Sequence, residues 1–305
     1  YEVLDNAPRL RGVNWNPVVG DEDQDQVSTL AKVCTDDLLS AFGLGELRYG
    51  RLPLELLSSI PTRRLALQIA TYDRLVGEAG LAAGGTWAMK RMSRHAAVEG
   101  LDSLPEHGPV LFVSNHPGLA DAVALFAAIP RPDLRIVAAE RPFLSALPNT
   151  SRYLLTINEK SPERLALVRQ ANRHLKRGGA MLTFPGGRIE PDPAVLPGAD
   201  AALEDWSSSV EFFARLEPNL VVVPVAVSGV ISTAALRNPL VFLRRRKEDQ
   251  RWLAATIQML VPRMRDVTTR VTFGEPIRAR DSGTLVGPAV LQEMRRLIHD
   301  HEACR

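Results

Sequence analysis

A histidine and an aspartate stand five positions apart in the stretch 114–121, with a Pro-Gly turn between them. Histidine titrates near neutral pH, so His116 can give or take a proton where most side chains cannot. A carboxylate beside the ring, such as that of Asp121, can fix the tautomer of the imidazole and stabilise its protonated form. The pair therefore predicts a general base at a catalytic centre.

Each of these residues taken alone has a simpler structural interpretation. A histidine after a strand is most often a turn residue, and an aspartate before an apolar helical run is most often a cap. Both, however, follow the apolar run 110–113, and ligands bind at the carboxyl ends of strands in open α/β sheets. The chain has no G-x-S-x-G nucleophile elbow and no cysteine near the histidine. If His116 acts, we expect it to act on a substrate hydroxyl rather than on a nucleophile of the protein.

A second stretch that could bind a substrate is Phe-Pro-Gly-Gly-Arg at 184–188, which also ends a predicted strand. Two glycines, Gly186 and Gly187, let the backbone approach a ligand closely. The guanidinium of Arg188 can bind a phosphate or a carboxylate through two parallel hydrogen bonds. Alone this stretch is weak evidence for a binding site, because Pro-Gly-Gly is a common turn and an exposed arginine is usually solvated.

The elements that position these motifs alternate between strand and helix after residue 100. We expect strands at 110–113, 134–138, 153–157, 180–184, 220–227 and 267–273, and helices at 121–129, 161–177, 207–216 and 287–301. This alternation predicts an α/β fold, with a largely parallel central sheet flanked by helices.

The first hundred residues differ, because they indicate helices and no convincing strand. We expect an extended arm at 1–26, then helices at 27–42, from Pro61 onward, and at 81–92, the last loosened by Gly84-Gly85. The chain is therefore predicted to have a helical N-terminal region at 1–100 that packs on the main domain. The α/β domain is predicted at 101–305.

Composition narrows the class of protein. The chain has 305 residues, of which 45% are hydrophobic and 24% charged, as in ordinary globular proteins. A formal net charge of +2 gives no indication of a nucleic-acid partner. Cys34 and Cys304 lie far apart and are expected to be free thiols in a reducing compartment. The six histidines show no metal-ligand spacing, so we expect no metal site.

The hydropathy pattern predicts a cytoplasmic protein that acts at a membrane from its surface, on the inner face. The first 26 residues are polar, which predicts no signal peptide there, and a start at Tyr1 rather than methionine leaves open whether residues precede it. The uncharged stretch 218–236 is β-branched and then broken by Ser-Gly, so it indicates a buried strand rather than a membrane span. A basic run at 244–247 follows Phe242 and Leu243. This run is either a solvated helix face or a contact for anionic lipid head groups or an acidic carrier protein.

These motifs together resemble the glycerophospholipid acyltransferase family, which includes the lysophosphatidic acid acyltransferases. The first family motif, Asn-His-x-x-x-x-Asp, is matched by Asn115, His116 and Asp121. The third motif, Phe-Pro-Glu-Gly-Thr-Arg, is matched by residues 184–189. The second region of the family looks like 139–143 with 156–160, and its Val-Pro-Val strand looks like 223–225.

The resemblance implies a direct transfer in phospholipid biosynthesis. His116 would take the proton of an acceptor hydroxyl, which attacks the thioester of acyl-CoA or of an acyl carrier protein, and Asp121 would orient the histidine. The acceptor would be a lysolipid or a glycerol-phosphate-like molecule, and no cofactor is implied beyond the thioester donor. The residues implied in substrate binding are Asn115, Arg141, Lys160, Gly186, Gly187 and Arg188.

The chain departs from the family pattern at the positions for the acceptor phosphate. Gly186 stands where the motif has glutamate, and Ile189 stands where it has arginine, with Arg188 one place early. In the second region, Glu159 or Lys160 replaces an arginine. These departures therefore leave open an acceptor whose head group is not glycerol phosphate. Two other classes are also open, namely a non-catalytic lipid- or phosphate-binding protein and an acyl-thioester hydrolase whose histidine activates water.

Overall fold

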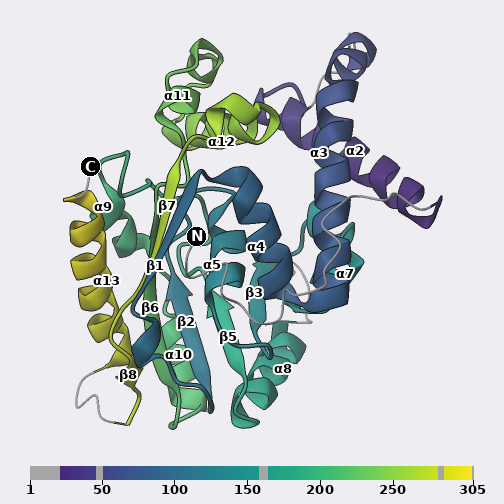
Figure 1. Cartoon of the computed structure of the whole chain (residues 1–305). Coiled ribbons are helices and arrows are strands. Elements are labelled where there is room, and N and C mark those ends of the chain that lie inside the picture. Colours follow the sequence, from purple (N-terminus) through teal and green to yellow (C-terminus); the bar gives the residue numbers. More distant parts are fainter. Residues whose placement is uncertain (1–20, 46–50, 158–163, 281–284, 304–305) are drawn as a thin grey trace.

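The computed structural model describes residues 21–45, 51–157, 164–280 and 285–303, in which an eight-stranded sheet lies between two layers of helices (Figure 1). The strand order is β1-β7-β6-β2-β5-β3-β4, with β8 paired to β6. The bounds are β1 His95–Glu99, β2 Val110–Ser114, β3 Arg135–Ala139, β4 Leu154–Ile157, β5 Ala180–Thr183, β6 Val221–Ser228, β7 Thr268–Phe273 and β8 Ile277–Arg278.

The sheet is largely parallel, as the alternation of elements predicts. Strand β2 pairs in parallel with β5 and β6, and β3 pairs in parallel with β4 and β5. Only β7 and β8 run antiparallel to β6. Every residue of β2 and β6 is buried, because helices cover both faces of these central strands.

Pro224 lies inside the central strand β6, where a missing N–H normally weakens a sheet. On one side of the strand it pairs with Val113 of β2. On the other side it lies between the two antiparallel partners, because β8 pairs with residues 221–222 and β7 with residues 225–228. The proline therefore stands where β6 changes partner, and its carbonyl accepts the N–H of Gly274 at 2.8 Å.

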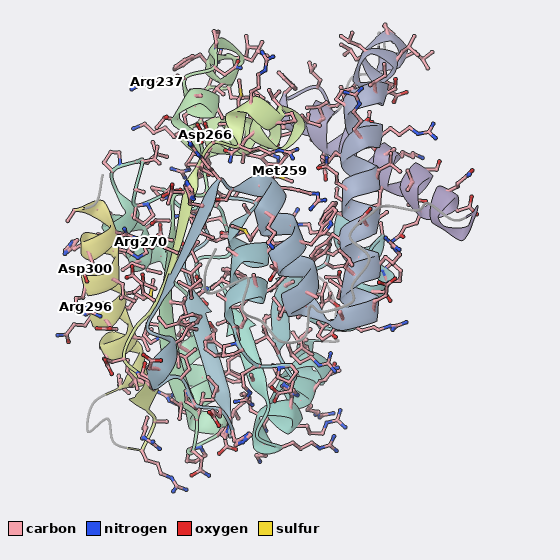
Figure 2. The ribbon with its side chains drawn as sticks, viewed as in Figure 1. Arg237, Met259, Asp266, Arg270, Arg296 and Asp300 are labelled. Atoms are coloured by element: carbon pink, nitrogen blue, oxygen red, sulfur yellow. The ribbon has the colours of Figure 1, made fainter. Side chains whose placement is uncertain are left out.

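The alternation of side chains along β2 defines two hydrophobic cores. Val110 and Phe112 face one core, and Leu111 and Val113 face the other. The first core is covered by α3 (Arg51–Ala79), α4 (Leu81–Met92) and α5 (Asp121–Ala128). The second is covered by α8 (Arg164–Lys176), α9 (Ala199–Ala202), α10 (Ser209–Leu216) and α13 (Val286–Glu302). Arg296 and Asp300 form an ion pair on the outward side of α13 (Figure 2).

The remaining helices connect or cap these layers. A third small core joins α11 (Thr233–Leu236), η4 (Pro239–Leu243) and α12 (Lys247–Leu260) to the end of α2 (Asp21–Ala41), and these elements lie at the top of Figure 1. The short helices are α6 (Pro142–Ser145), α7 (Pro148–Ser151), η2 (Leu101–Ser103), η3 (Leu203–Asp205) and η5 (Pro262–Met264). No helix in the described ranges combines the length and the apolar character that a membrane span requires.

The N-terminal helices begin earlier than expected. Helix α2 starts at Asp21, so the prediction of an extended arm is wrong for residues 21–26, and residues 1–20 lie outside the described ranges. Helix α3 starts at Arg51 and contains Pro61 in its interior rather than in its first turn. The helix continues through this proline because it packs along α2, and tertiary packing outweighs the local cost of proline. The described part of α8 begins at Arg164, so residues 161–163 of the helix expected at 161–177 lie outside these ranges.

One strand in the first hundred residues contradicts the expectation of helices alone. Strand β1 follows α4 and pairs in parallel with β7, from His95 opposite Thr268 to Glu99 opposite Thr272. Its sequence, His-Ala-Ala-Val-Glu, has no apolar run, because β1 lies at the edge of the sheet and is only half-buried. The sheet therefore begins before residue 100.

Gly84 and Gly85 do not loosen α4 but let it pack closely. A Cβ atom at Gly85 would lie 2.7 Å from the backbone nitrogen of Ala127 and 2.8 Å from the carbonyl oxygen of Val123. Both of these atoms belong to α5, the helix that follows the predicted histidine motif. Gly85 therefore lets α4 pack directly against α5, while Gly84 faces Tyr72 and Val76 of α3.

A buried carboxylate fastens the N-terminal helices to the sheet domain. Asp73 of α3 is fully buried and accepts hydrogen bonds from the backbone N–H and the hydroxyl of Thr150, at 2.8 and 2.7 Å. Asn149 donates its N–H and its amide to the same carboxylate, and Gln26 of α2 donates its amide. The first turn of α7 is thereby joined to α2 and α3.

Candidate active site

The predicted histidine and aspartate are in direct contact at the carboxyl end of β2. Asp121 Oδ2 lies 2.6 Å from His116 Nδ1, which places the proton of the neutral ring on Nδ1. In the described ranges no hydrogen bond engages the other ring nitrogen, Nε2, and 28% of the histidine side chain is exposed. His116 Nε2 can therefore accept a proton from a bound hydroxyl.

Asp121 is both the partner of the histidine and a group at the start of a helix. Its Oδ1 accepts the N–H of Ala122 at 2.8 Å, in the first turn of α5, and its Oδ2 also accepts the N–H of Gly118 at 3.3 Å. The side chain is fully buried. The structural and the catalytic interpretation of this residue are thus compatible, because fixing the carboxylate on α5 also fixes the imidazole.

The electrostatics of the site favour a protonated imidazole. Burial alone lowers the pKa of His116, but the carboxylates of Asp121 and Glu190 outweigh it, and the net shift of the pKa is upward from 6.5. A base whose pKa lies close to the working pH combines a usable unprotonated fraction with good proton affinity. The local charges therefore suit proton transfer near neutral pH.

Two neighbours hold the loop that carries the histidine. The side-chain amide of Asn115 donates to the carbonyl of Val227 at 2.9 Å and accepts the N–H of Val227 at 2.8 Å. Asn115 thereby joins the ends of β2 and β6, with its polar group facing the sheet. The ring of Phe184 lies 4.9 Å from the imidazole, measured between centroids. The two predicted motifs therefore meet at His116.

The glycines of the second motif form a tight turn after β5. The N–H of Gly187 donates to the carbonyl of Phe184 at 3.1 Å, and Gly187 has a φ of 63°, which favours glycine. Pro185 occupies the position of this turn that its fixed φ suits. The turn directs the following residues, 188–190, along the edge of the site.

Arg188 has carboxylate partners within the protein. It pairs with Asp205 of η3 and lies 3.7 Å from Glu248 of α12. About half of its side chain is exposed, so these pairs are accessible to solvent. Its charge is thus shared between two acidic groups rather than presented alone to an acceptor phosphate.

The other predicted binding residues are not brought to the histidine by a described contact. Arg141 is exposed at the start of α6. Burial raises the pKa of Asp37 on α2, and the charge of Arg141 lowers it in part. Lys160 and Glu159 lie outside the described residues.

The structure adds a glutamate that the sequence motifs did not single out. Glu190 accepts the backbone N–H of His116 at 2.7 Å through Oε2, and it accepts the indole N–H of Trp206 at 2.6 Å through Oε1. Its own N–H donates to the carbonyl of His116 at 2.8 Å. Burial raises the pKa of Glu190, and these hydrogen bonds lower it in part. The only signal in the sequence is an acidic residue close to the second motif.

A second acidic residue of the same loop, Asp192, attaches the loop to the end of β6. Asp192 is fully buried, and its carboxylate accepts the N–H groups of Ala194, Gly229, Val230 and Ile231 at 2.8–3.1 Å. Burial raises the pKa of Asp192, and the four hydrogen bonds lower it in part. The loop that follows the second motif is thereby attached to the end of β6.

Arg251 of α12 is a further cation at this edge. One of its terminal nitrogens donates to the carbonyl of Ile189 at 3.3 Å, and its Nε is buried without a hydrogen-bond partner among the described residues. Burial lowers the pKa of its guanidinium. Sequence reasoning missed this residue because α12 itself was not predicted.

The fold and the paired histidine and aspartate define a class of protein. Residues 95–228 match the model of the acyltransferase family, and this segment contains both motifs and Glu190. The match covers less than half of the chain, and over this segment the chain is similar to the acyltransferases. Among solved structures it is similar to the 1-acyl-sn-glycerophosphate (LPA) acyltransferase PlsC from Thermotoga maritima, with 15% identity and a TM-score of 0.47 over 92% of this chain and 95% of that chain. No curated protein gives a significant match.

Proposed function

We propose that the protein moves a fatty acyl group from a thioester, carried by CoA or by an acyl carrier protein, to a hydroxyl of a lysoglycerolipid. The observation that carries this proposal is the 2.6 Å contact between Asp121 and His116 Nδ1, which leaves Nε2 at the partly exposed side of the ring. The absence of a G-x-S-x-G elbow from the sequence supports a direct transfer without an acyl-enzyme.

In this mechanism His116 Nε2 removes the proton of the acceptor hydroxyl as the oxygen attacks the carbonyl carbon of the thioester. The new C–O bond forms, the C–S bond breaks, and the thiolate leaves with the proton that the imidazole had taken. Asp121 holds the ring and stabilises the imidazolium between the two proton transfers. We propose that no cofactor is needed beyond the thioester.

The head group of the acceptor is the more open part of the proposal. Arg188 is already paired with acidic side chains, and Gly186 and Ile189 carry no charge. The acceptors to test are therefore a panel of lysolipids, some with a phosphate monoester and some without. Arg251 is a further cation that could bind an acidic head group.

The decisive experiment incubates the protein with a long-chain acyl-CoA or acyl carrier protein, with and without this panel, and follows free thiol and acylated lipid. Thiol that appears only with an acceptor, together with an acylated product, supports the transferase. Thiol release without an acceptor would indicate a hydrolase, and no release under any condition would indicate a binding protein. Either of these two results would overturn the proposal.

The pH dependence of the transfer should report the raised pKa of His116. Below this pKa the ring carries a proton on Nε2 and cannot accept another, so kcat/KM should fall by about tenfold for each pH unit on the acid side. Because the carboxylates raise the pKa, the midpoint of this limb should lie above 6.5. A pH profile of kcat/KM checks this, and a midpoint below 6 would contradict the assignment of His116 as the base.

We also propose that the protein binds the surface of an anionic membrane, on the cytoplasmic side. Exposed apolar side chains lie in the first turns of α3 and in η4. They include Leu52 and Leu57, which are 80% and 81% exposed, and Phe242, which is 68% exposed. Figure 2 shows Arg237 at the end of α11, close to η4 in sequence. Apolar groups flanked by basic ones suit insertion among lipid head groups.

The structure refines the basic run that follows Phe242. Arg244 is bound to Asp249 at 2.8 Å, whereas the side chains of Arg245, Arg246 and Lys247 are exposed. The run connects η4 to α12, and only Lys247 belongs to a helix, so the interpretation as a helix face is wrong for Arg244–Arg246. Three basic residues therefore remain for contact with lipid head groups.

Neutralising Arg245, Arg246 and Lys247 with glutamine should weaken binding to vesicles that contain anionic phospholipid by about 10²-fold, since each basic residue near such a surface contributes about 1 kcal/mol. Vesicle flotation measures this binding. The matched control neutralises three exposed cations on or beside α8, Arg173, Lys176 and Arg177, and should bind like the wild type. Equal binding by both triple variants would contradict the proposed docking surface.

A further inference from the structure

The carboxylate of Glu190 is held by two donors and has no role in the proposed proton transfer. Only 4% of the residue is exposed. Its Oε2 accepts the backbone N–H of His116 at 2.7 Å, and its Oε1 accepts the indole N–H of Trp206 at 2.6 Å. A buried carboxylate with one donor on each oxygen is a fixed point from which other groups can be positioned.

The bond to the main chain of His116 is one of a reciprocal pair. While the side chain of Glu190 accepts the N–H of His116, the N–H of Glu190 donates to the carbonyl of His116 at 2.8 Å. The peptide groups on both sides of the histidine are therefore fixed to a single residue 74 positions away. Asp121 fixes the imidazole, and Glu190 fixes the backbone that carries it.

The carboxylate of Glu190 fills the space that a side chain at Gly186, in the second motif, would occupy. A Cβ atom at Gly186 would lie 2.6 Å from Glu190 Oε1 and 3.0 Å from its Cδ. The motif that this stretch resembles, Phe-Pro-Glu-Gly-Thr-Arg, has a glutamate at the position of Gly186. In this chain a side chain there would displace the carboxylate that arrives from Glu190.

We propose that Glu190 is a positioning residue for His116, and that it uses the space left by Gly186 to hold the histidine's main chain for proton transfer. The inference rests on the proposed function for its catalytic meaning. Trp206 belongs to the same arrangement, because its indole fixes the second oxygen of the carboxylate. Removing this support displaces the base, and a misplacement of about 1 Å can reduce a rate about 10²-fold.

Because His116 and Trp206 each donate to one oxygen of Glu190, variants of Glu190 and Trp206 can separate the effects of the two hydrogen bonds. Glutamine has the size of glutamate, but it offers one acceptor oxygen and one NH₂ group, so it cannot accept from both N–H groups. In Glu190→Gln either the main chain of His116 or the indole of Trp206 faces an NH₂ group. In the double variant Glu190→Gln/Trp206→Phe the indole donor is gone, and the glutamine oxygen is free to accept from His116.

The experiment measures kcat/KM for acyl transfer and its pH profile in the wild type and these variants. Glu190→Gln should lose about 10²-fold, Trp206→Phe alone should lose less than about tenfold, and the double variant should recover at least about tenfold over Glu190→Gln. The acid limb of the double variant should lie at lower pH than that of the wild type, because one of the carboxylates that raise the pKa of His116 is gone. Asp121 remains as the other carboxylate beside the ring.

A second readout is independent of catalysis. Titration of the His116 ring by NMR should give a lower pKa in both Glu190 variants than in the wild type and in Trp206→Phe. Urea unfolding of all four proteins separates a general loss of stability from a local effect. If the wild type transfers no acyl group, the proposed function fails, and the NMR titration still decides whether Glu190 acts on His116.

Two results would overturn the positioning role. One is an activity of Glu190→Gln within a factor of three of the wild type. The other is a loss that the double variant does not recover, with an unchanged pKa of His116 and a lowered stability, which would make Glu190 a purely structural residue.

Discussion

Replacing His116 with alanine should lower the rate of acyl transfer by about 10²- to 10⁴-fold, or about 3–5 kcal/mol of the activation barrier, and should leave the fold intact. The imidazole is the one titratable group of the two motifs whose free nitrogen faces the partly exposed side of the site. Without it the acceptor hydroxyl loses its general base. The measurement is kcat/KM with a long-chain acyl thioester and the best acceptor of the panel.

Two further variants make this result specific. His107→Ala removes an exposed histidine outside the site and should transfer acyl groups like the wild type. Asp121→Asn keeps the size of the side chain, but its NH₂ group can donate to Nδ1, which favours the ring tautomer with the proton on Nε2. This variant should also lose most of its activity. Near-wild-type turnover by His116→Ala would refute the assignment of the base.

Replacing Asp192 with asparagine should reduce the free energy of unfolding by about 2–4 kcal/mol. The buried carboxylate accepts two N–H groups on each oxygen, from Ala194 and Gly229 on Oδ1 and from Val230 and Ile231 on Oδ2. Asparagine can accept on one side only, and its NH₂ group would face two buried donors on the other. The loop between the second motif and η3 would then lose its attachment to the end of β6.

Urea unfolding followed by circular dichroism measures this loss. The control is Asp102→Asn, an exposed aspartate of η2, whose midpoint should not change measurably. Because this loop carries Glu190, the Asp192 variant should also be less active in the folded state. A change in unfolding free energy below about 0.5 kcal/mol would mean that the carboxylate does not anchor the loop.

Strands with a continuous apolar run, such as β2 and β6, and the alternating strand β7 were predictable from the sequence, whereas β1 was not. Strands β2 and β6 are buried on both faces, so their side chains are apolar at every position that packing requires. Strand β1 is an edge strand with little apolar character, and its partner β7 lies more than 170 residues later. Helix α12 was not predicted, because its first turn continues a basic run that was interpreted by its charge alone. The apolar residues of its buried face, which include Leu253 and Ile257, come later in the helix.

The candidate site also has contacts that were predictable from the sequence and contacts that were not. His116 and Asp121 are close in sequence, so one motif contains both and their contact could be anticipated. The role of Glu190 depends on contacts with residues 74 positions before it and 16 positions after it, which no local pattern contains. The pairing of Arg188 with Glu248 depends on the placement of an unpredicted helix. The contact between His116 and Asp121 was therefore more predictable than the contacts of Glu190 and Arg188.

The order of strands in the sheet has a consequence for synthesis on the ribosome. Strand β2, at the centre, emerges early, but its neighbours β5 and β6 emerge only about 70 and 110 residues later. Strand β1 meets β7 only after about 170 further residues have been made. Until β5 and β6 emerge, the nascent chain carries the apolar strand β2 with two open edges, which is a target for chaperones and for aggregation. His116, two residues beyond β2, is thus fixed late, after the loops from β5 and β6 have closed around it.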